Sequence, residues 1–197
     1  DRDGNFADVV TGYDSLSGYV NDKSFFGAIV GRYGNRINNG KFNLEGNEYQ
    51  LTLNDGQNHL HGGNKGYYKA IWNAEVLENE SEPTLKLTLV SPDGDEGYPG
   101  TVAMFVTYTL TNDNELKIEY MGTTDKTTIL NPTHHSYFNL SGDFNNTILD
   151  EQLYINADST TIVNNELIPT GEIASVEDTP MDFREPSSIG QHINDSV

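Results

Sequence analysis

Apolar and polar residues alternate along much of this sequence, and a period of two is that of half-buried β-strands. Between residues 101 and 110 the alternation is regular, and residues 111–114 form a polar turn before a second alternating run at 116–120. This pattern predicts a β-hairpin. One face of its first strand consists of the apolar side chains at even positions, Val102, Met104, Val106, Tyr108 and Leu110.

Similar runs recur along the chain, separated by turns rich in Gly and Asn, and predict an all-β fold, a sandwich or a barrel, as a single domain over residues 1–197. The one predicted helix is 187–194, with Ser187 or Ser188 as its cap and Ile189 and Ile193 on one face. The further predicted strands lie at 25–30, 42–44, 49–53, 71–78, 84–89, 147–157 and 160–164.

The charge balance restricts the possible ligands. Eleven Lys and Arg residues stand against 30 Asp and Glu residues, a formal net charge of −19. Such a chain repels nucleic-acid phosphates, anionic lipid heads and phosphorylated metabolites, so we expect no nucleic-acid or membrane partner and favour a neutral ligand. A solvated acidic surface would give the same composition. The absence of Cys excludes disulfides and a Cys nucleophile.

The segment at residues 31–38 carries two arginines in a chain with few basic residues. A guanidinium group is a planar, multiple donor that suits the hydroxyls and ring oxygen of a sugar. Pairing with a surface acid is the simpler alternative, and we favour it for Arg32. Arg36 lies between Asn35 and the apolar Ile37, and this position favours a role in a site.

A histidine followed by two glycines marks the segment at residues 58–66. Glycines leave the neighbouring backbone uncovered, so the ring of His61 should be accessible. The spacing of His59 and His61 would place both on one strand face. A metal site is an alternative, but Asp55 is the single nearby carboxylate and the chain has no thiol, so we predict no metal.

Two further segments interrupt the strand pattern. Residues 131–140 contain His134 and His135, which would face opposite ways on a strand and so cannot share one role. A lone buried histidine is usually structural. Tyr137 in this segment offers a flat apolar ring on which a pyranose could stack, although it could equally belong to the core. Residues 91–100 form an acceptor-rich turn that indicates a hairpin connection or a site wall.

Taken together, these segments resemble the aldose 1-epimerase family of the galactose mutarotase-like fold. The resemblance implies a large antiparallel β-sandwich (supersandwich) and an enzyme that interconverts the α and β anomers of free aldohexoses such as galactose and glucose, with no cofactor or metal. The matching stretches, which span the chain in order, are Gly31–Gly40, Asn58–Gly63, Asp93–Gly100, Asn131–Gly142, Leu167–Glu172 and Met181–Arg184.

The resemblance also implies roles for individual residues. Asn35 and Arg36 would contact the sugar, His61 would hold it near the ring oxygen, and His135 would be the general acid. His134 stands where many relatives carry Asn and receives no catalytic role. We further predict that Arg36, His61 and His135 converge on one pocket.

The family's sugar-binding Asp and its general base, a Glu, belong to later segments that these residues do not contain. We therefore expect the domain to be incomplete and inactive alone. A start without Met and the lack of a closing strand also indicate an incomplete domain. The alternatives are a hexose-6-phosphate epimerase, which should carry more Arg and Lys, a non-catalytic carbohydrate-binding module, and a structural fragment. A cytoplasmic monomer or homodimer is expected, with a periplasmic or secreted protein also possible.

Overall fold

The computed structural model describes residues 3–78 and 81–195. The chain divides into two compact units. The sheet unit comprises Ala28–His134, and the terminal unit combines Asp1–Gly27 with His135–Val197. Strands predominate in both units, as the alternating sequence predicts.

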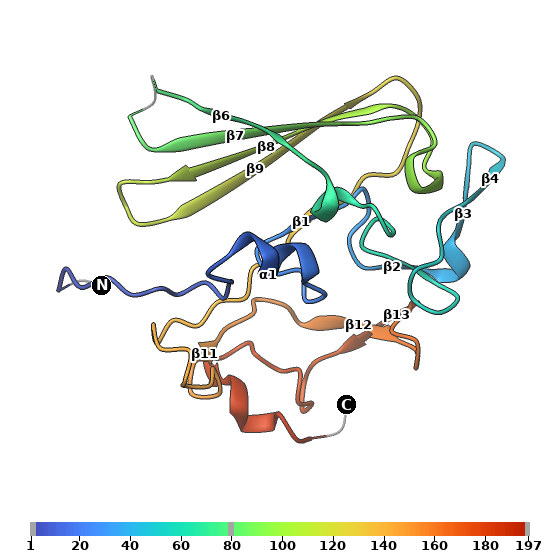
Figure 1. The fold of residues 1–197 in the computed structure, drawn as a ribbon. Helices are drawn as coiled ribbons and strands as arrows, with labels where there is room; N and C mark the ends of the chain where they lie inside the picture. Colours follow the sequence, from blue (N-terminus) through green and yellow to red (C-terminus); the bar gives the residue numbers. More distant parts are fainter. Residues whose placement is uncertain (1–2, 79–80, 196–197) are drawn as a thin grey trace. The chain divides into compact units, whose positions relative to one another are not determined.

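The largest element of the sheet unit is an antiparallel four-stranded sheet in the order β6-β7-β8-β9 (Figure 1). The rest of the sheet unit, as far as it is described, contains three pairs of strands, β1–β10, β2–β5 and β3–β4, and three short 3-10 helices, η1–η3. The bounds are β1 Ile29–Val30, β2 Arg36–Ile37, η1 Asn38–Gly40, β3 Lys41–Leu44, β4 Asn47–Gln50, β5 His59–Leu60, η2 Tyr67–Lys69, β6 Asn73–Val76, β7 Thr84–Ser91, η3 Asp95–Gly97, β8 Val102–Leu110, β9 Leu116–Thr124 and β10 Thr133–His134.

Both hairpins expected from the alternation are present. β8 and β9 pair through the turn at 111–114, with Leu110 opposite Leu116. β3 and β4 pair with Phe42 opposite Tyr49, and their rings stack with centroids 5.3 Å apart. β4 ends at Gln50, earlier than the predicted run to 53.

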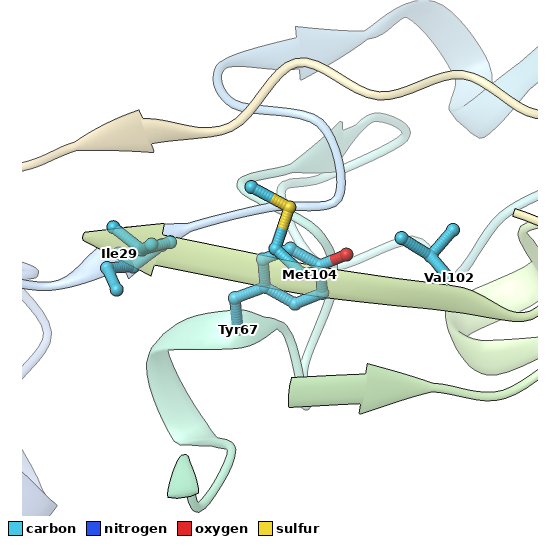
Figure 2. Packing of buried hydrophobic residues seen from close by; sticks show 5 residues of the cluster. Ile29, Tyr67, Val102 and Met104 are labelled. Carbon is cyan, nitrogen blue, oxygen red and sulfur yellow. The ribbon is translucent and has the colours of Figure 1, made fainter. Parts of the chain in front are cut away.

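The core of the sheet unit lies against one face of β8. Val102, Met104 and Val106 are at most 1% exposed, as the even-position pattern predicts. Figure 2 shows Met104 between Ile29 and Val102, close to the ring of Tyr67. Removing this apolar surface from water stabilises the unit by roughly 25 cal/mol per Å². The same face is exposed at the far end of the strand, since 54% of Leu110 is accessible.

Over residues 3–27 and 135–195, the terminal unit contains one α-helix, two pairs of strands, β11–β14 and β12–β13, and one 3-10 helix. Residues far apart in sequence meet in it, because Val10 bridges Phe138. Its buried apolar residues include Ile168 and Val176. The bounds are α1 Leu16–Asn21, β11 Gln152–Leu153, β12 Ser159–Val163, β13 Pro169–Ser175, β14 Ser187–Ser188 and η4 Ile189–His192.

The helix predictions were wrong. Ser187 and Ser188 pair with β11 as strand β14, so just one 3-10 turn follows, and Ser188 makes no side-chain cap. Gly190 also lies so close to Leu149 that a Cβ there would be 2.9 Å from the leucine Cβ. The α1 helix was missed because it is six residues long, contains Gly18 and buries no residue, although Leu16, Tyr19 and Val20 recur at helical spacing. In the described part of the chain, no helix combines the length and the apolar character needed to cross a lipid bilayer.

Candidate functional site

The pairing of β2 with β5 brings the two histidine- and arginine-bearing segments of the sheet unit together. Just outside this pair, the backbone N–H of Asn35 donates to Nδ1 of His61 at 2.9 Å, and the backbone N–H of His61 donates to the carbonyl of Asn35 at 3.0 Å. Both residues have left-handed backbone, with φ of 65° and 51°. The imidazole is therefore fixed by the main chain of the neighbouring segment.

This contact assigns the tautomer of His61. A ring nitrogen that accepts a hydrogen bond from a backbone N–H carries no proton, so the neutral ring carries its proton on Nε2. The Nε2–H group is a donor, and a donor is what a sugar oxygen requires. His61 is only partly buried.

Arg36 forms an ion pair in the same place. Its Nε donates to Oδ2 of Asp55 at 2.7 Å, and its Nη1 lies 3.4 Å from Oδ1 of Asn35. The Arg36 side chain is 19% exposed and that of Asp55 is 37% exposed. Asn35, Arg36, Asp55 and His61 form what is called the Arg36 cluster below; the sequence alone indicates Asp55 only as a possible metal ligand.

Arg32 does not pair with a surface acid, and that prediction was wrong. The residue is 2% exposed, and its guanidinium donates to Oγ and the carbonyl of Ser91 and to the carbonyls of Pro92 and Pro99. Burial lowers the pKa of Arg32. The hydrogen bonds of the Arg32 guanidinium stabilise the connection between β7 and β8. Residues 91–100 are therefore the hairpin connection that the sequence indicates.

His59 and His61 do not share a strand face, contrary to the prediction. β5 ends at Leu60, and the left-handed backbone of His61 turns its side chain out of the strand alternation. His59 is fully buried, with Nδ1 2.6 Å from the Thr52 carbonyl and Nε2 2.6 Å from Oη of Tyr98. Both of its nitrogens are engaged, so His59 is structural. Among residues 3–78 and 81–195 no group of three or more His, Asp or Glu side chains is arranged to hold a metal ion.

The terminal unit gathers aromatic rings around His135. Its ring centroid lies 5.4 Å from that of Phe25 and 5.3 Å from that of Tyr137. Phe26 packs edge-on against Tyr137 at 5.2 Å. Tyr137 remains 45% exposed, so the group offers an accessible flat surface beside an imidazole. Phe25, Phe26, His135 and Tyr137 are called the aromatic cluster below.

His134 has different neighbours from His135. It lies in β10 of the sheet unit, opposite Ile29, and its ring packs against that of Tyr108 at a centroid distance of 5.6 Å. The two adjacent histidines thus have distinct environments, as expected for successive residues of an extended chain.

The predicted site residues therefore fall into two groups. The structure brings Asn35, Arg36 and His61 together in the sheet unit, and His135 and Tyr137 together in the terminal unit. Their convergence on one pocket stays a prediction. Asp55 was missed as a partner of Arg36 because the two residues are 19 positions apart, and only the folded turn brings them into contact.

The fold belongs to a known class of β-sandwich proteins. An aldose epimerase homologue from C. elegans superposes with a TM-score of 0.89 at 34% identity, and the match covers 100% of this chain and 59% of that one. The fold is thus all-β and of the galactose mutarotase-like type, as the resemblance implied.

Sequence comparison gives the family. The aldose 1-epimerase family model matches residues 1–197, and the chain belongs to this family. It is 47% identical to a galactose mutarotase from Bos taurus over 195 residues, which are 99% of this chain. An aldose 1-epimerase from Escherichia coli is 36% identical over 95% of the chain. The chain spans only 56% and 53% of the lengths of these two relatives.

Proposed function

We propose that the protein containing these residues is an aldose 1-epimerase that interconverts the α and β anomers of free aldohexoses, galactose and glucose among them. The observation that carries the proposal is the Arg36 cluster. In it, the main chain of Asn35 fixes the ring of His61 so that its Nε2–H is a donor, and the guanidinium of Arg36 contacts the side chain of Asn35. The family membership and the names of the relatives support the same activity.

The reaction defines what such residues would do. Opening the cyclic hemiacetal requires a proton at the ring oxygen and removal of the proton of the anomeric hydroxyl. Rotation about the C1–C2 bond and ring closure then give the other anomer. Histidine can give and recover a proton near neutral pH, and a positioned acid or base contributes about 10²–10⁴-fold.

We assign the general acid to His135, following the resemblance, and sugar-holding hydrogen bonds to His61, Asn35 and Arg36. Tyr137 would supply a stacking surface, which its exposed ring in the aromatic cluster supports. The general base and a further sugar-binding carboxylate are assigned to segments outside residues 1–197. A cytoplasmic location and a monomeric or dimeric state also stay predictions.

Polarimetry of the full-length protein on fresh α-galactose and α-glucose tests this function. We expect the approach to the equilibrium rotation to accelerate in proportion to enzyme concentration. A methyl galactoside, whose ring cannot open, should inhibit but not react. Galactose binding in a calorimeter without any acceleration of mutarotation would instead identify a carbohydrate-binding module. Turnover restricted to hexose 6-phosphates would identify the phosphate-specific relative.

A further inference from the structure

Asp55 makes a one-sided contact with Arg36. The carboxylate accepts from Nε at 2.7 Å, so it occupies the Nε edge of the guanidinium. A guanidinium carries five N–H donors in a rigid plane, and the remaining four are on its two Nη atoms. Fixing the Nε edge therefore fixes the direction in which the Nη donors point.

The turn that carries Asp55 is itself held in place. The main chains of Asp55 and Asn58 exchange hydrogen bonds of 3.1 and 2.9 Å. The Asn58 side chain accepts from the backbone N–H of Asn39 at 3.0 Å, and the Asn54 side chain bonds both the N–H and the carbonyl of Leu60. These bonds fix the main chain that carries the carboxylate relative to β5.

The pair also changes the charge that a ligand meets. An uncompensated guanidinium is a strong binder of phosphate and carboxylate groups. Paired with Asp55, Arg36 keeps N–H donors, but the two side chains together carry no net charge. Such a group suits the hydroxyls of a neutral sugar and gives little advantage to an anionic one, particularly in a chain with a net charge of −19.

We propose that Asp55 is a positioning and specificity residue, which orients Arg36 and cancels its charge so that the site selects neutral aldoses over phosphorylated ones. This inference rests on the proposed function in taking an aldose as the ligand. It assigns to one carboxylate the discrimination between free and phosphorylated sugars.

Two substitutions of Asp55 separate its effect on the orientation of Arg36 from its effect on the charge of the site. Asp55→Asn keeps the shape and removes the charge, whereas Asp55→Glu keeps the charge and displaces it by one methylene. Glu48→Gln is the matched control, because Glu48 pairs with Lys41 at 2.9 Å on the surface of the same unit, where the two side chains are 58% and 47% exposed.

Galactose mutarotation by the full-length protein is measured with increasing inorganic phosphate at constant ionic strength. We expect Asp55→Asn to strengthen phosphate inhibition by about tenfold, the equivalent of roughly 1.4 kcal/mol. Asp55→Glu should raise the KM for galactose by about 2- to 10-fold through misplaced hydrogen bonds, while phosphate inhibition stays weak. Glu48→Gln should match the wild type in both quantities.

Equal phosphate inhibition in Asp55→Asn and Glu48→Gln would overturn the specificity role. An unchanged KM in Asp55→Glu would overturn the positioning role. If the wild type binds galactose without mutarotase activity, the proposed function fails, but the inference is still decided by calorimetric titration with phosphate and with galactose. If Asp55→Asn does not fold, Asp55→Ala is titrated in its place, with the same expected gain in phosphate affinity.

Discussion

Removing one hydroxyl from the buried Tyr98 tests the packing of His59 in β5, the strand that pairs with β2 and its Arg36. Tyr98 is 1% exposed, and its Oη lies 2.6 Å from Nε2 of the fully buried His59. The other ring nitrogen of His59 lies 2.6 Å from the carbonyl of Thr52. A carbonyl can only accept, so Nδ1 carries the proton and Nε2 accepts the hydrogen bond that the Tyr98 hydroxyl donates.

Tyr98→Phe leaves Nε2 of His59 buried without this donor. An unsatisfied buried acceptor costs about 1–3 kcal/mol. For a folded unit of about 150–250 residues, each kcal/mol lowers Tm by about 2–4 °C, so the variant should melt roughly 2–12 °C below the wild type.

Urea unfolding followed by circular dichroism measures the change as a lower midpoint with an unchanged m-value. Tyr120→Phe, on β9, is the matched control, because Tyr120 is 36% exposed and a substitution at such a site should change the free energy of unfolding by less than about 0.5 kcal/mol. If Tyr98→Phe proved as stable as Tyr120→Phe, the hydrogen bond between Tyr98 and His59 would not contribute to the free energy of unfolding, and the reasoning would be refuted.

Two further predictions concern the same unit. Burial lowers the pKa of His59 from its usual 6.5. As the pH falls through 6.5, the unfolded chain therefore binds a proton at this residue that the folded chain does not. The free energy of unfolding should consequently fall as the pH drops from 7.5 to 5.5. His59→Gln should weaken this dependence in urea titrations, and an equal slope in both proteins would contradict the assignment. A Cβ at Gly62 would lie 1.7 Å from the Gly31 carbonyl oxygen, whereas one at Gly46, also at positive φ, would meet nothing within 4 Å. Gly62→Ala should therefore lower the unfolding midpoint far more than Gly46→Ala, whose cost is the backbone strain of about 1–2 kcal/mol; similar losses would exclude the clash.

The strand content could be predicted because it depends on local alternation. The buried face of β8 follows directly from the even-position residues, and the turn after Leu110 is visible in its polar composition. The roles of Arg32 and His59 could not be predicted in this way. Arg32 is buried because backbone carbonyls 59 to 67 positions later surround its guanidinium, and His59 contacts a tyrosine 39 positions away.

The candidate site could be predicted only in part, because composition is a local property whereas the contacts between side chains are not. Unusual composition marked the segments of Asn35, Arg36, His61 and His135, but the partner of each side chain depends on pairing between distant strands. The sequence shows a lone Asp55; the folded turn makes it a partner of Arg36. A helix at 187–194 failed because pairing with β11 outweighed the local cap signal.

The central claim is that the chain supplies the general acid of an aldose epimerase at His135. The most direct test compares kcat and KM for galactose in full-length His135→Asn and His134→Asn proteins. Loss of a general acid is felt mainly in the transition state, so kcat of His135→Asn should fall by about 10²-fold or more with a smaller change in KM. His134→Asn, with its ring packed on Tyr108, should keep nearly the wild-type kcat. Equal losses in the two variants, or an undiminished kcat in His135→Asn, would contradict the account.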